Sequence, residues 1–562
     1  MIEQKLRQFL LEAYERCIQN GELSLLPERV ELEEPKMASH GDFATNLALM
    51  QAKGEGKSPR DIAGKIVKEL SQEDFIQRVD IAGPGFINFS IHPHYFLELL
   101  HDCFTQKETY GTQSFKQKKH FMVEFVSANP TGPLHIGHGR GAVYGDVLAN
   151  LFTAMGYNVT KEYYLNDVGI QMETLGCSVL MRLREIKGET VDFKENYYQG
   201  TYIRTLAEEL YQLQGDNVFK RSEKEAIQIC STYAANSIFE GIKRDLKDIG
   251  VNHDTYFYEH TLHERKSIQK TFDFLAAKKF TYEKEGALWF CSTQFGDDKD
   301  RVLRKSDGSL TYFAADIAYH KEKYDRGFDR VMNVLGADHG GYVSRMKAAV
   351  KAFGYSEDSF DIVLIQLVNL IHEGKLVSMS TRSAQYETLR DVFLEVGKDV
   401  CRYFFLMRSH TAQLDFDLNL AKTESPENPV YYIQYAHARI CSIFRKADEL
   451  KFSFEKVDVR LLDLPEEIEL TKMLASYPKI IQKSAQLLEP HRLAFYLLEL
   501  SKLFQSYYSK AKQDERYRIL QRNTQKTGAS LYLLKNIQIV IQNGFRILGL
   551  EAPEQMTGRD DV

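Results

Sequence analysis

The chain has 562 residues, of which 43% are hydrophobic and 27% charged, and its formal net charge at pH 7 is −6. This composition is typical of a globular protein, and the length exceeds what one hydrophobic core supports, so we expect about three or four domains. The negative net charge excludes a chain that binds polyanions over its whole surface, so any contact with nucleic acid must come from a local basic surface.

The sequence has no uninterrupted apolar run of membrane-spanning length and no leading signal peptide. We therefore expect no membrane contact and a location in the cytoplasm. The seven cysteines are odd in number and scattered, without a Cys-x-x-Cys pair. This pattern predicts reduced, mostly buried thiols and no metal site held by the protein.

Residues 1–115 form the first predicted domain, which we expect to be α+β. Helical patterns and short strand-like runs are mixed there, and a turn at residues 83–85 precedes the alternating Phe86, Asn88 and Ser90. Such a turn between two short strands is typical of a hairpin. The segment contains no cluster of residues suited to catalysis.

Residues 116–420 form the second predicted domain, which begins with a basic run at residues 116–120. Strand-like runs alternate with long helical stretches, a pattern that predicts a Rossmann-like parallel sheet with its ligand at the carboxyl ends of the strands. Residues 172–300 are charged, have a mostly helical pattern and contain no recognisable motif, so we expect a helical insertion without chemistry of its own.

Residues 421–562 are predicted to form a C-terminal helical bundle. Between residues 479 and 526 there are ten Lys or Arg against four acidic residues, a local charge of +6 in a chain of opposite sign. Apolar residues recur there at helical spacing and leave the basic residues for the opposite face. This pattern fits an RNA-binding surface, but also the solvated face of an ordinary bundle.

The most informative segment is residues 129–138, Asn-Pro-Thr-Gly-Pro-Leu-His-Ile-Gly-His. It follows a strand-like run at 121–126 and precedes a helical pattern that ends at Gly156. His135 and His138 should therefore lie on the first turn of a helix, where free N–H groups and the helix dipole favour an anion. Their imidazoles could donate to a phosphate in a transition state, or they could be merely solvated or capping residues.

The wider segment 124–146 resembles the signature region of class I aminoacyl-tRNA synthetases, and within them the arginyl-tRNA synthetases of the bacterial type. Similar family blocks follow the same order along nearly the whole chain, at residues 40–46, 83–89, 163–169, 312–320, 336–342, 428–439 and 548–556. The resemblance implies ATP-dependent ligation of L-arginine to tRNA(Arg) through arginyl-adenylate. It also implies that the first domain contacts tRNA and that the third binds the anticodon.

The resemblance also implies a pocket for the substrate arginine. Its residues would be Glu124, Ser127, Asn129, Tyr312, Asp316 and Gln366. Carboxylates suit a guanidinium because its planar fork of donors can bind two oxygens at once, and an aromatic ring can pack on its face. For Gln366, a ligand contact and a locally satisfied amide in a buried strand remain equally good interpretations.

The same family assigns ATP to the segment around the two histidines and to a second segment at residues 336–342. The implied catalytic residues are His135, His138 and Arg382. The implied ATP-binding residues are Asn129, Pro130, Thr131, Gly132, Pro133, Leu134, Ile136, Gly137, Gly139, Gly336, Asp338, His339, Met379 and Ser380. Small residues would let the backbone approach the nucleotide, and Asp338 or His339 could bond the ribose, although a turn capped by an Asp explains the second segment equally well. Asn166, Asp167 and Gln171 are further residues that could line the pocket.

The sequence departs from the class at its second signature, the Lys-Met-Ser-Lys-Ser loop. Residues 378–382 read Ser-Met-Ser-Thr-Arg, so both lysines are absent. The arginyl family includes a Met-Ser-Thr-Arg form, but Ser378 is more unusual. The phosphate charge must still be neutralised, and Arg382, Lys375 and a bound Mg²⁺ are the candidates.

These observations predict ATP with Mg²⁺ as cofactors, L-arginine and tRNA(Arg) as partners, and a monomer. Three alternatives remain open: a class I synthetase for another amino acid, a free-standing nucleotidyltransferase, and a non-catalytic tRNA-binding paralogue. The paralogue is suggested by the altered signature loop, whereas a nucleotidyltransferase would lack the basic C-terminal helices.

Overall fold

The structure is a computed structural model that describes residues 2–35, 37–71, 73–115, 118–377, 388–454 and 457–556. The chain forms two compact units. One comprises residues 1–105, 452–475 and 517–533, and the other comprises residues 106–451, 476–516 and 534–562.

The N-terminal part is α+β, as predicted. Its elements are α1 (Ile2–Gln19), β1 (Phe43–Thr45), α2 (Leu47–Glu55), α3 (Pro59–Glu69), β2 (Ile76–Ala82), β3 (Phe86–Ile91) and α4 (Pro93–Gln106). The strands form an antiparallel sheet in the order β1-β3-β2. Gly83 (φ 52°) and Gly85 (φ 144°) turn the chain between β2 and β3, a conformation that favours glycine. Ile87, Phe89 and Ile91 of β3 are buried in one core with α1, α2 and α3.

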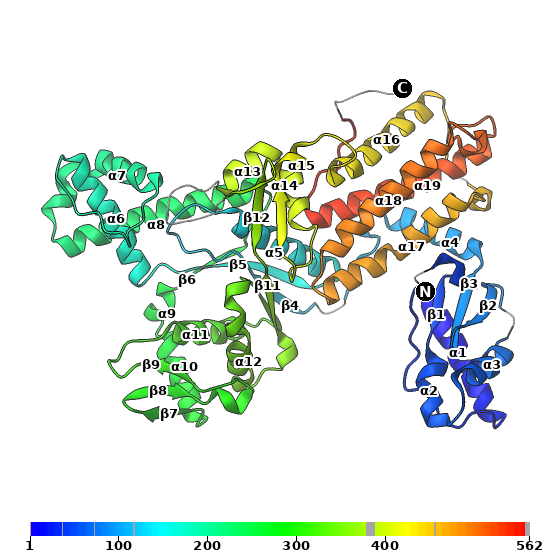
Figure 1. The fold of residues 1–562 in the computed structure, drawn as a ribbon, viewed down its shortest axis with the longest axis horizontal. Coiled ribbons are helices and arrows are strands. Elements are labelled where there is room, and N and C mark those ends of the chain that lie inside the picture. Colours follow the sequence, from blue (N-terminus) through cyan, green and yellow to red (C-terminus); the bar gives the residue numbers. More distant parts are fainter. Residues whose placement is uncertain are drawn as a thin grey trace. The chain divides into compact units, whose positions relative to one another are not determined.

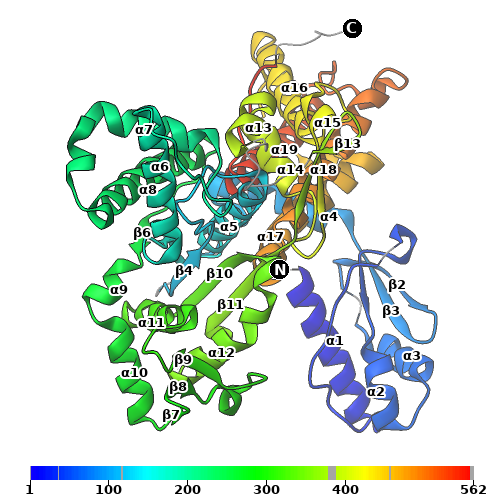
Figure 2. The same ribbon diagram turned by 60° about the vertical axis from the view of Figure 1, so that its left-hand side comes forward.

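The predicted parallel sheet is confirmed. Its five strands are β4 (His120–Glu124), β5 (Asn158–Leu165), β6 (Thr255–Tyr258), β10 (Arg330–Gly336) and β11 (Phe360–Ile365). Their order is β11-β10-β4-β5-β6, with every neighbouring pair parallel. Helix α11 (Tyr312–Asp325) precedes β10, and α12 (Val343–Ala352) lies beside β11 (Figure 2).

Helix α5 (Ile136–Ala154) follows β4 and packs on this sheet. It ends at Ala154, and Gly156 has φ 87°, which agrees with the predicted stop. Gly145 lies against Phe125, where an added β-carbon would overlap the Cβ and Cγ atoms of the Phe125 side chain. The missing side chain therefore lets α5 approach the end of β4 closely.

The segment predicted as a helical insertion at residues 172–300 has a more varied structure. Helices α6 (Ile170–Ile186), α7 (Thr201–Gln214) and α8 (Glu223–Asp248) pack together (Figure 1). Residues Thr255–Tyr258, however, form β6, an edge strand of the main sheet, so this part is integral to the sheet. After it come α9 (His260–Glu264), α10 (Ser267–Ala277) and a small sheet of β7 (Thr281–Lys284), β8 (Ala287–Phe290) and β9 (Arg301–Arg304).

A third small sheet follows the main one. It contains β12 (Val368–His372), β13 (Lys375–Val377) and β14 (Leu414–Asp417), and α13 (Leu389–Val396), α14 (Lys398–Phe405) and α15 (Leu418–Lys422) lie in the same part of the chain. The guanidinium of Arg140, on α5, is fully buried and donates to the backbone oxygens of Gln366, Ser409 and Ala412 at 2.8–2.9 Å. These bonds tie α5 to the segments that flank this small sheet.

The C-terminal region is helical, as predicted, with α16 (Pro429–Glu449), α17 (Pro465–Gln486), α18 (His491–Lys510) and α19 (Thr524–Leu548). Several side chains of its basic stretch form ion pairs: Arg492 with Glu489, Lys502 with Glu499, Arg516 with Asp514 and Lys526 with Glu467. Local acids thus balance part of the predicted basic surface.

Within the described ranges, none of the helices combines the length and the apolar character that crossing a bilayer requires. The seven cysteines are free thiols, and all except Cys177 are buried, as the sequence predicted.

We predict that Gly145→Ala destabilises the protein by about 1–3 kcal/mol, because the new methyl group overpacks against Phe125. Gly141→Ala is the matched control, since nothing lies within 4 Å of its added β-carbon on the same helix. At position 141, alanine should stabilise the protein by about 0.5–1 kcal/mol, because glycine in a helix loses more conformational freedom on folding. Thermal unfolding of the two variants measures the contrast, and equal melting temperatures would contradict the packing described for α5.

Candidate active site

The candidate site lies at the carboxyl ends of the parallel strands. From β4 the chain continues to β5 and β6 on one side and later adds β10 and β11 on the other, so the strand order reverses between β4 and β10. Ligands of open α/β sheets bind outside such a reversal. Three predicted residues lie at this edge: Glu124 ends β4, Gly336 ends β10, and Gln366 directly follows β11.

His135 and His138 begin α5. His135 is the N-cap residue, and its Nδ1 accepts the N–H of Gly137 at 3.1 Å, while Nδ1 of His138 accepts the N–H of His135 at 3.3 Å. The two rings stack with their centroids 3.7 Å apart. Because each Nδ1 is an acceptor, each Nε2 must carry the hydrogen of the neutral ring. The capping interpretation therefore holds for Nδ1, and it leaves two Nε2–H donors at the positive end of the helix dipole.

Burial keeps both histidines neutral. It lowers the pKa of His135, and together with the repulsion that a protonated His135 would exert it lowers that of His138 to about 3. A neutral imidazole donates a hydrogen bond without carrying a net charge of its own. The arrangement can therefore stabilise a developing oxyanion through aligned donors.

The turn between β4 and α5 is strained. Val126 (φ 69°) and Ser127 (φ 41°) adopt the left-handed region, which is unusual for a β-branched residue. The hydroxyl of Ser127 holds this turn, since it donates to Glu124 Oε1 at 2.9 Å and accepts the N–H of Tyr164 at 3.1 Å. Backbone strain that the surroundings maintain is common at functional sites.

The predicted nucleotide segment continues this turn. Asn129 Nδ2 donates to Gln171 Oε1 at 2.6 Å, and the hydroxyl of Tyr202 donates to the backbone oxygen of Thr131 at 2.7 Å. The predicted ATP-binding residues of this segment divide into two groups. Five are partly exposed: Asn129, Thr131, Gly132, Pro133 and Gly137. The other four are buried: Pro130, Leu134, Ile136 and Gly139. The side chains of the four buried residues thus pack inside the protein and fix the shape of the segment. At Gly139, for example, an added β-carbon would lie 2.5 Å from Leu389.

Carboxylates gather beside this turn. Burial and, to a lesser degree, the nearby charges of Glu259 and Glu124 together raise the pKa of Asp316 to about 8, against the opposing effect of Lys323 and Arg345. Burial also raises the pKa of Glu259, which directly follows β6. Acids that repel one another in a buried place favour a cationic ligand, because such a ligand removes the repulsion.

The other two residues predicted for this pocket differ in their exposure. Tyr312 is the first residue of α11, four positions before Asp316, and 77% of its surface is exposed. Gln366 is half-buried, its N–H donates to His410 O at 2.9 Å, and its own carbonyl accepts from Arg140 at 2.8 Å. These contacts satisfy its backbone, so both interpretations of its side chain remain open.

The second predicted nucleotide segment is on the surface. Gly336, Asp338 and His339 are exposed at the end of β10, and the side chain of Asp338 is 83% exposed, with His339 Nε2 3.6 Å from its carboxylate. Asp167, by contrast, is engaged in structure, because its carboxylate accepts the N–H of His260 at 3.0 Å and bonds its ring.

The predicted Met379, Ser380 and Arg382 lie outside the described residues. The residues on either side of this segment are described: β13 ends at Val377, and Thr388 forms an isolated bridge with His135, next to a bond of 2.8 Å from Leu389 N to Leu134 O. The residues that follow the segment are thus bonded directly to the start of α5.

Two residues that the sequence patterns did not single out also belong here. Glu259 and Lys323 are both buried close to Asp316, and Lys323 bonds Glu124. Glu259 carries one possible signal, its position directly after a β-strand. Lys323 carries none, because a lysine near the end of a helix is ordinarily a solvated residue.

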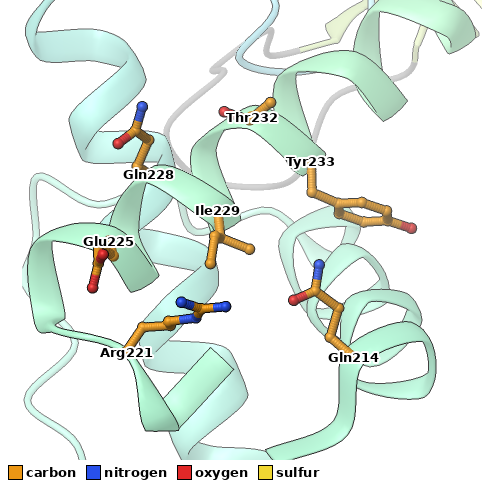
Figure 3. A pocket seen from close by; sticks show the side chains of 7 residues that line it. All are labelled: Gln214, Arg221, Glu225, Gln228, Ile229, Thr232 and Tyr233. Atoms are coloured by element: carbon orange, nitrogen blue, oxygen red, sulfur yellow. The ribbon is translucent and has the colours of Figure 1, made fainter. Parts of the chain in front are cut away.

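Two surface hollows contain no predicted site residue. The first, of about 520 Å³, lies in the helical part of the chain and is lined by Gln214, Arg221, Glu225, Gln228, Ile229, Thr232 and Tyr233 (Figure 3). The second, of about 580 Å³, is lined by Glu22, Lys57, Arg60, Asp61, Gly64, Lys65 and Lys68.

The described residues include no group of three or more His, Cys, Asp or Glu suited to hold a metal ion. A magnesium ion that arrives with ATP needs no such group, because it takes its ligands mainly from phosphate and water.

Comparison with known proteins covers nearly the whole chain. Residues 1–91 match the arginyl tRNA synthetase N terminal domain, residues 99–404 the catalytic domain of tRNA synthetases class I (R), and residues 433–556 the DALR anticodon binding domain. An arginine--tRNA ligase from Syntrophotalea carbinolica is 46% identical over 561 residues, which cover 99% of this chain and 100% of the relative. One from Desulfosudis oleivorans is 48% identical and covers 94% of this chain and 95% of the relative.

The chain belongs to the arginyl-tRNA synthetase family. The solved arginyl-tRNA synthetase of Thermus thermophilus matches it with a TM-score of 0.73 over 99% of this chain and 100% of that one, and at 21% identity this likeness shows the shared fold. The protein is accordingly an enzyme, and ATP is one of its substrates.

We predict that His138 of this synthetase stays neutral between pH 5 and 8, with its hydrogen on Nε2, because burial lowers its pKa to about 3. Nitrogen-15 NMR of protein labelled at histidine measures both the tautomer and the titration. His138→Asn identifies the resonance. A His138 signal that titrates near the ordinary histidine pKa of about 6.5 would contradict the geometry of this site.

Proposed function

We propose that the protein ligates L-arginine to tRNA(Arg) at the expense of ATP, through an arginyl-adenylate intermediate, for translation in the cytoplasm. The observation that carries the proposal is the pair of neutral histidines at the start of α5, in a chain that matches arginine--tRNA ligases over 99% of its length. The carboxylates at the same end of the sheet support the assignment of a cationic amino acid as the substrate.

In the first step, the carboxylate of arginine attacks the α-phosphorus of ATP and pyrophosphate leaves. Negative charge grows on the phosphate oxygens, and the Nε2–H groups of His135 and His138 donate to them. In the second step, a terminal ribose hydroxyl of the tRNA attacks the arginyl carbonyl and AMP leaves. Neither step needs a covalent intermediate with the enzyme.

The arginine pocket combines the buried carboxylates of Glu124 and Glu259 with the half-buried carboxylate of Asp316, which can pair with the guanidinium and the α-ammonium of the substrate. Ser127 and Asn129 add hydrogen-bonding groups at the turn after β4, Tyr312 offers a ring, and Gln366 an amide. A site with a fixed carboxylate partner for a guanidinium strongly rejects lysine, because its buried polar groups would be left unmatched.

The triphosphate requires further positive charge. We assign this role to Arg382, with Met379 and Ser380 on the same loop and with Lys375 before it. Magnesium enters as the MgATP substrate and neutralises phosphate charge. The remaining ATP contacts come from the segment 129–139 and from Gly336, Asp338 and His339.

We further propose three domains, at residues 1–115, 116–420 and 421–562, that contact the tRNA, perform the chemistry and bind the anticodon. The matches to an N-terminal domain, a class I catalytic domain and an anticodon-binding domain support this division. We expect the protein to act as a monomer.

The proposed function predicts that the protein releases pyrophosphate from ATP when L-arginine and tRNA(Arg) are supplied, and that it charges this tRNA. His138→Asn should lower kcat about 100- to 1,000-fold through the lost donor. Charging is measured with radiolabelled arginine. Turnover with another amino acid would redirect the assignment, and tRNA binding without turnover would identify a non-catalytic paralogue.

The pocket also predicts a pH dependence. Asp316 pairs with the substrate only when ionised, and its pKa is about 8 in the free protein, so kcat/KM for arginine should rise with pH through about 8. Asp316→Asn should abolish this rise and lower kcat/KM throughout. Steady-state kinetics from pH 6 to 9 test both, with kcat/KM for ATP at saturating arginine as the internal control. A profile that Asp316→Asn leaves unchanged would contradict the assignment.

A further inference from the structure

Lys323 is a fully buried lysine near the end of α11. Its Nζ donates to Glu124 Oε2 at 2.5 Å and to Asn333 Oδ1 at 2.9 Å, and it lies 4.3 Å from the centre of the Tyr319 ring. An ammonium group without water is costly unless it is paired and hydrogen-bonded. Its partners therefore account for its presence at this position.

Asn333 extends this contact into a chain of hydrogen bonds. It is the partner of Glu124 across β10 and β4, and its Nδ2 donates to His320 Nε2 at 2.9 Å. His320 Nδ1 in turn donates to the backbone oxygen of Asp316 at 2.8 Å. Burial lowers the pKa of His320 well below its usual value, which suits a neutral ring with one donor and one acceptor. The chain thus connects the carboxylate of Glu124 to the backbone of Asp316.

A second contact anchors the same face of α11. The guanidinium of Arg326, directly after the helix, bonds both oxygens of the buried Glu162 at 2.6 and 2.9 Å, and the hydroxyl of Tyr319 donates to the same carboxylate at 2.6 Å. Glu162 belongs to β5. Helix α11, with Arg326 directly after it, is therefore bonded to three adjacent strands, β10, β4 and β5. Lys323 makes the contact with β4.

We propose that Lys323 is a positioning residue of the arginine pocket, which holds the carboxylate of Glu124 and the helix that carries Tyr312 and Asp316 in place before the substrate binds. The inference rests on the proposed function, because it concerns the same pocket. Lys323 itself touches no substrate atom. It acts through Glu124 and through the bonded chain to Asp316.

The charge of Lys323 is as important as its position. Without it, the charges of Glu259 and Glu124 act on Asp316 with less opposition, so the pKa of Asp316 rises further and its carboxyl stays protonated to higher pH. A protonated carboxyl no longer pairs with a cation, so the pocket loses affinity for arginine. The contacts of Lys323 are with β4, β10 and its own helix, not with the histidines of α5, so the handling of ATP should change little.

The experiment compares Lys323→Met with Lys323→Gln, which keeps an N–H donor without the charge. Lys321→Met is the matched control, because Lys321 lies on the same helix and pairs with Asp325 at 2.8 Å. Each variant is assayed for ATP–pyrophosphate exchange with tRNA(Arg) present, at varied arginine and at varied ATP, and its thermal melting is recorded.

Lys323→Met should lower kcat/KM for arginine about 100-fold, while KM for ATP stays within about threefold. Lys323→Gln should lower kcat/KM for arginine about tenfold, and Lys321→Met should behave as the wild type. If Lys323→Met does not melt cooperatively, Lys323→Gln carries the test. Folded variants within threefold of the wild type, or equal losses for ATP and arginine, would overturn the inference. A wild type that is inactive with arginine would instead overturn the proposed function.

Discussion

The ion pair between Glu124 and Lys323 joins the strand that leads to the two histidines with the helix that carries Asp316. Both side chains are buried, so the pair persists only because hydrogen bonds to Ser127 and Asn333 satisfy its remaining atoms. The strained turn after β4 and the backbone of Asp316 are both bonded into this region. A rigid arrangement of this kind suits a reaction in which catalysis depends on positioning and electrostatics.

The two histidines stabilise a helix through one ring nitrogen each and leave the other for the role that the proposed function gives them. Their Nδ1 atoms cap the first turn of α5, and this capping determines which nitrogen carries the hydrogen. Burial then keeps the rings neutral. The structural and the functional interpretation of the motif therefore describe different atoms of the same residues.

Local patterns predicted much of the fold. The helix after residue 135, its end before Gly156 and the glycine turn at residues 83–85 all follow from spacing and turn chemistry, which are local properties. The segment at residues 172–300 was less predictable, because a four-residue edge strand such as β6 has too few residues to show a period. Its membership of the sheet depends on pairing with β5, which is far away in sequence.

For the candidate site, the sequence by itself determined the family, the histidine motif and the acids at positions 124 and 316, because these residues lie in contiguous blocks with a recognisable order. Only the tertiary structure brought Glu259 and Lys323 into the same pocket. Their contacts join residues between 57 and 199 positions apart, and no local pattern records such separations. The tertiary structure also decided the protonation of the site, because burial and neighbouring charges shift each pKa, and both depend on which distant segments pack together.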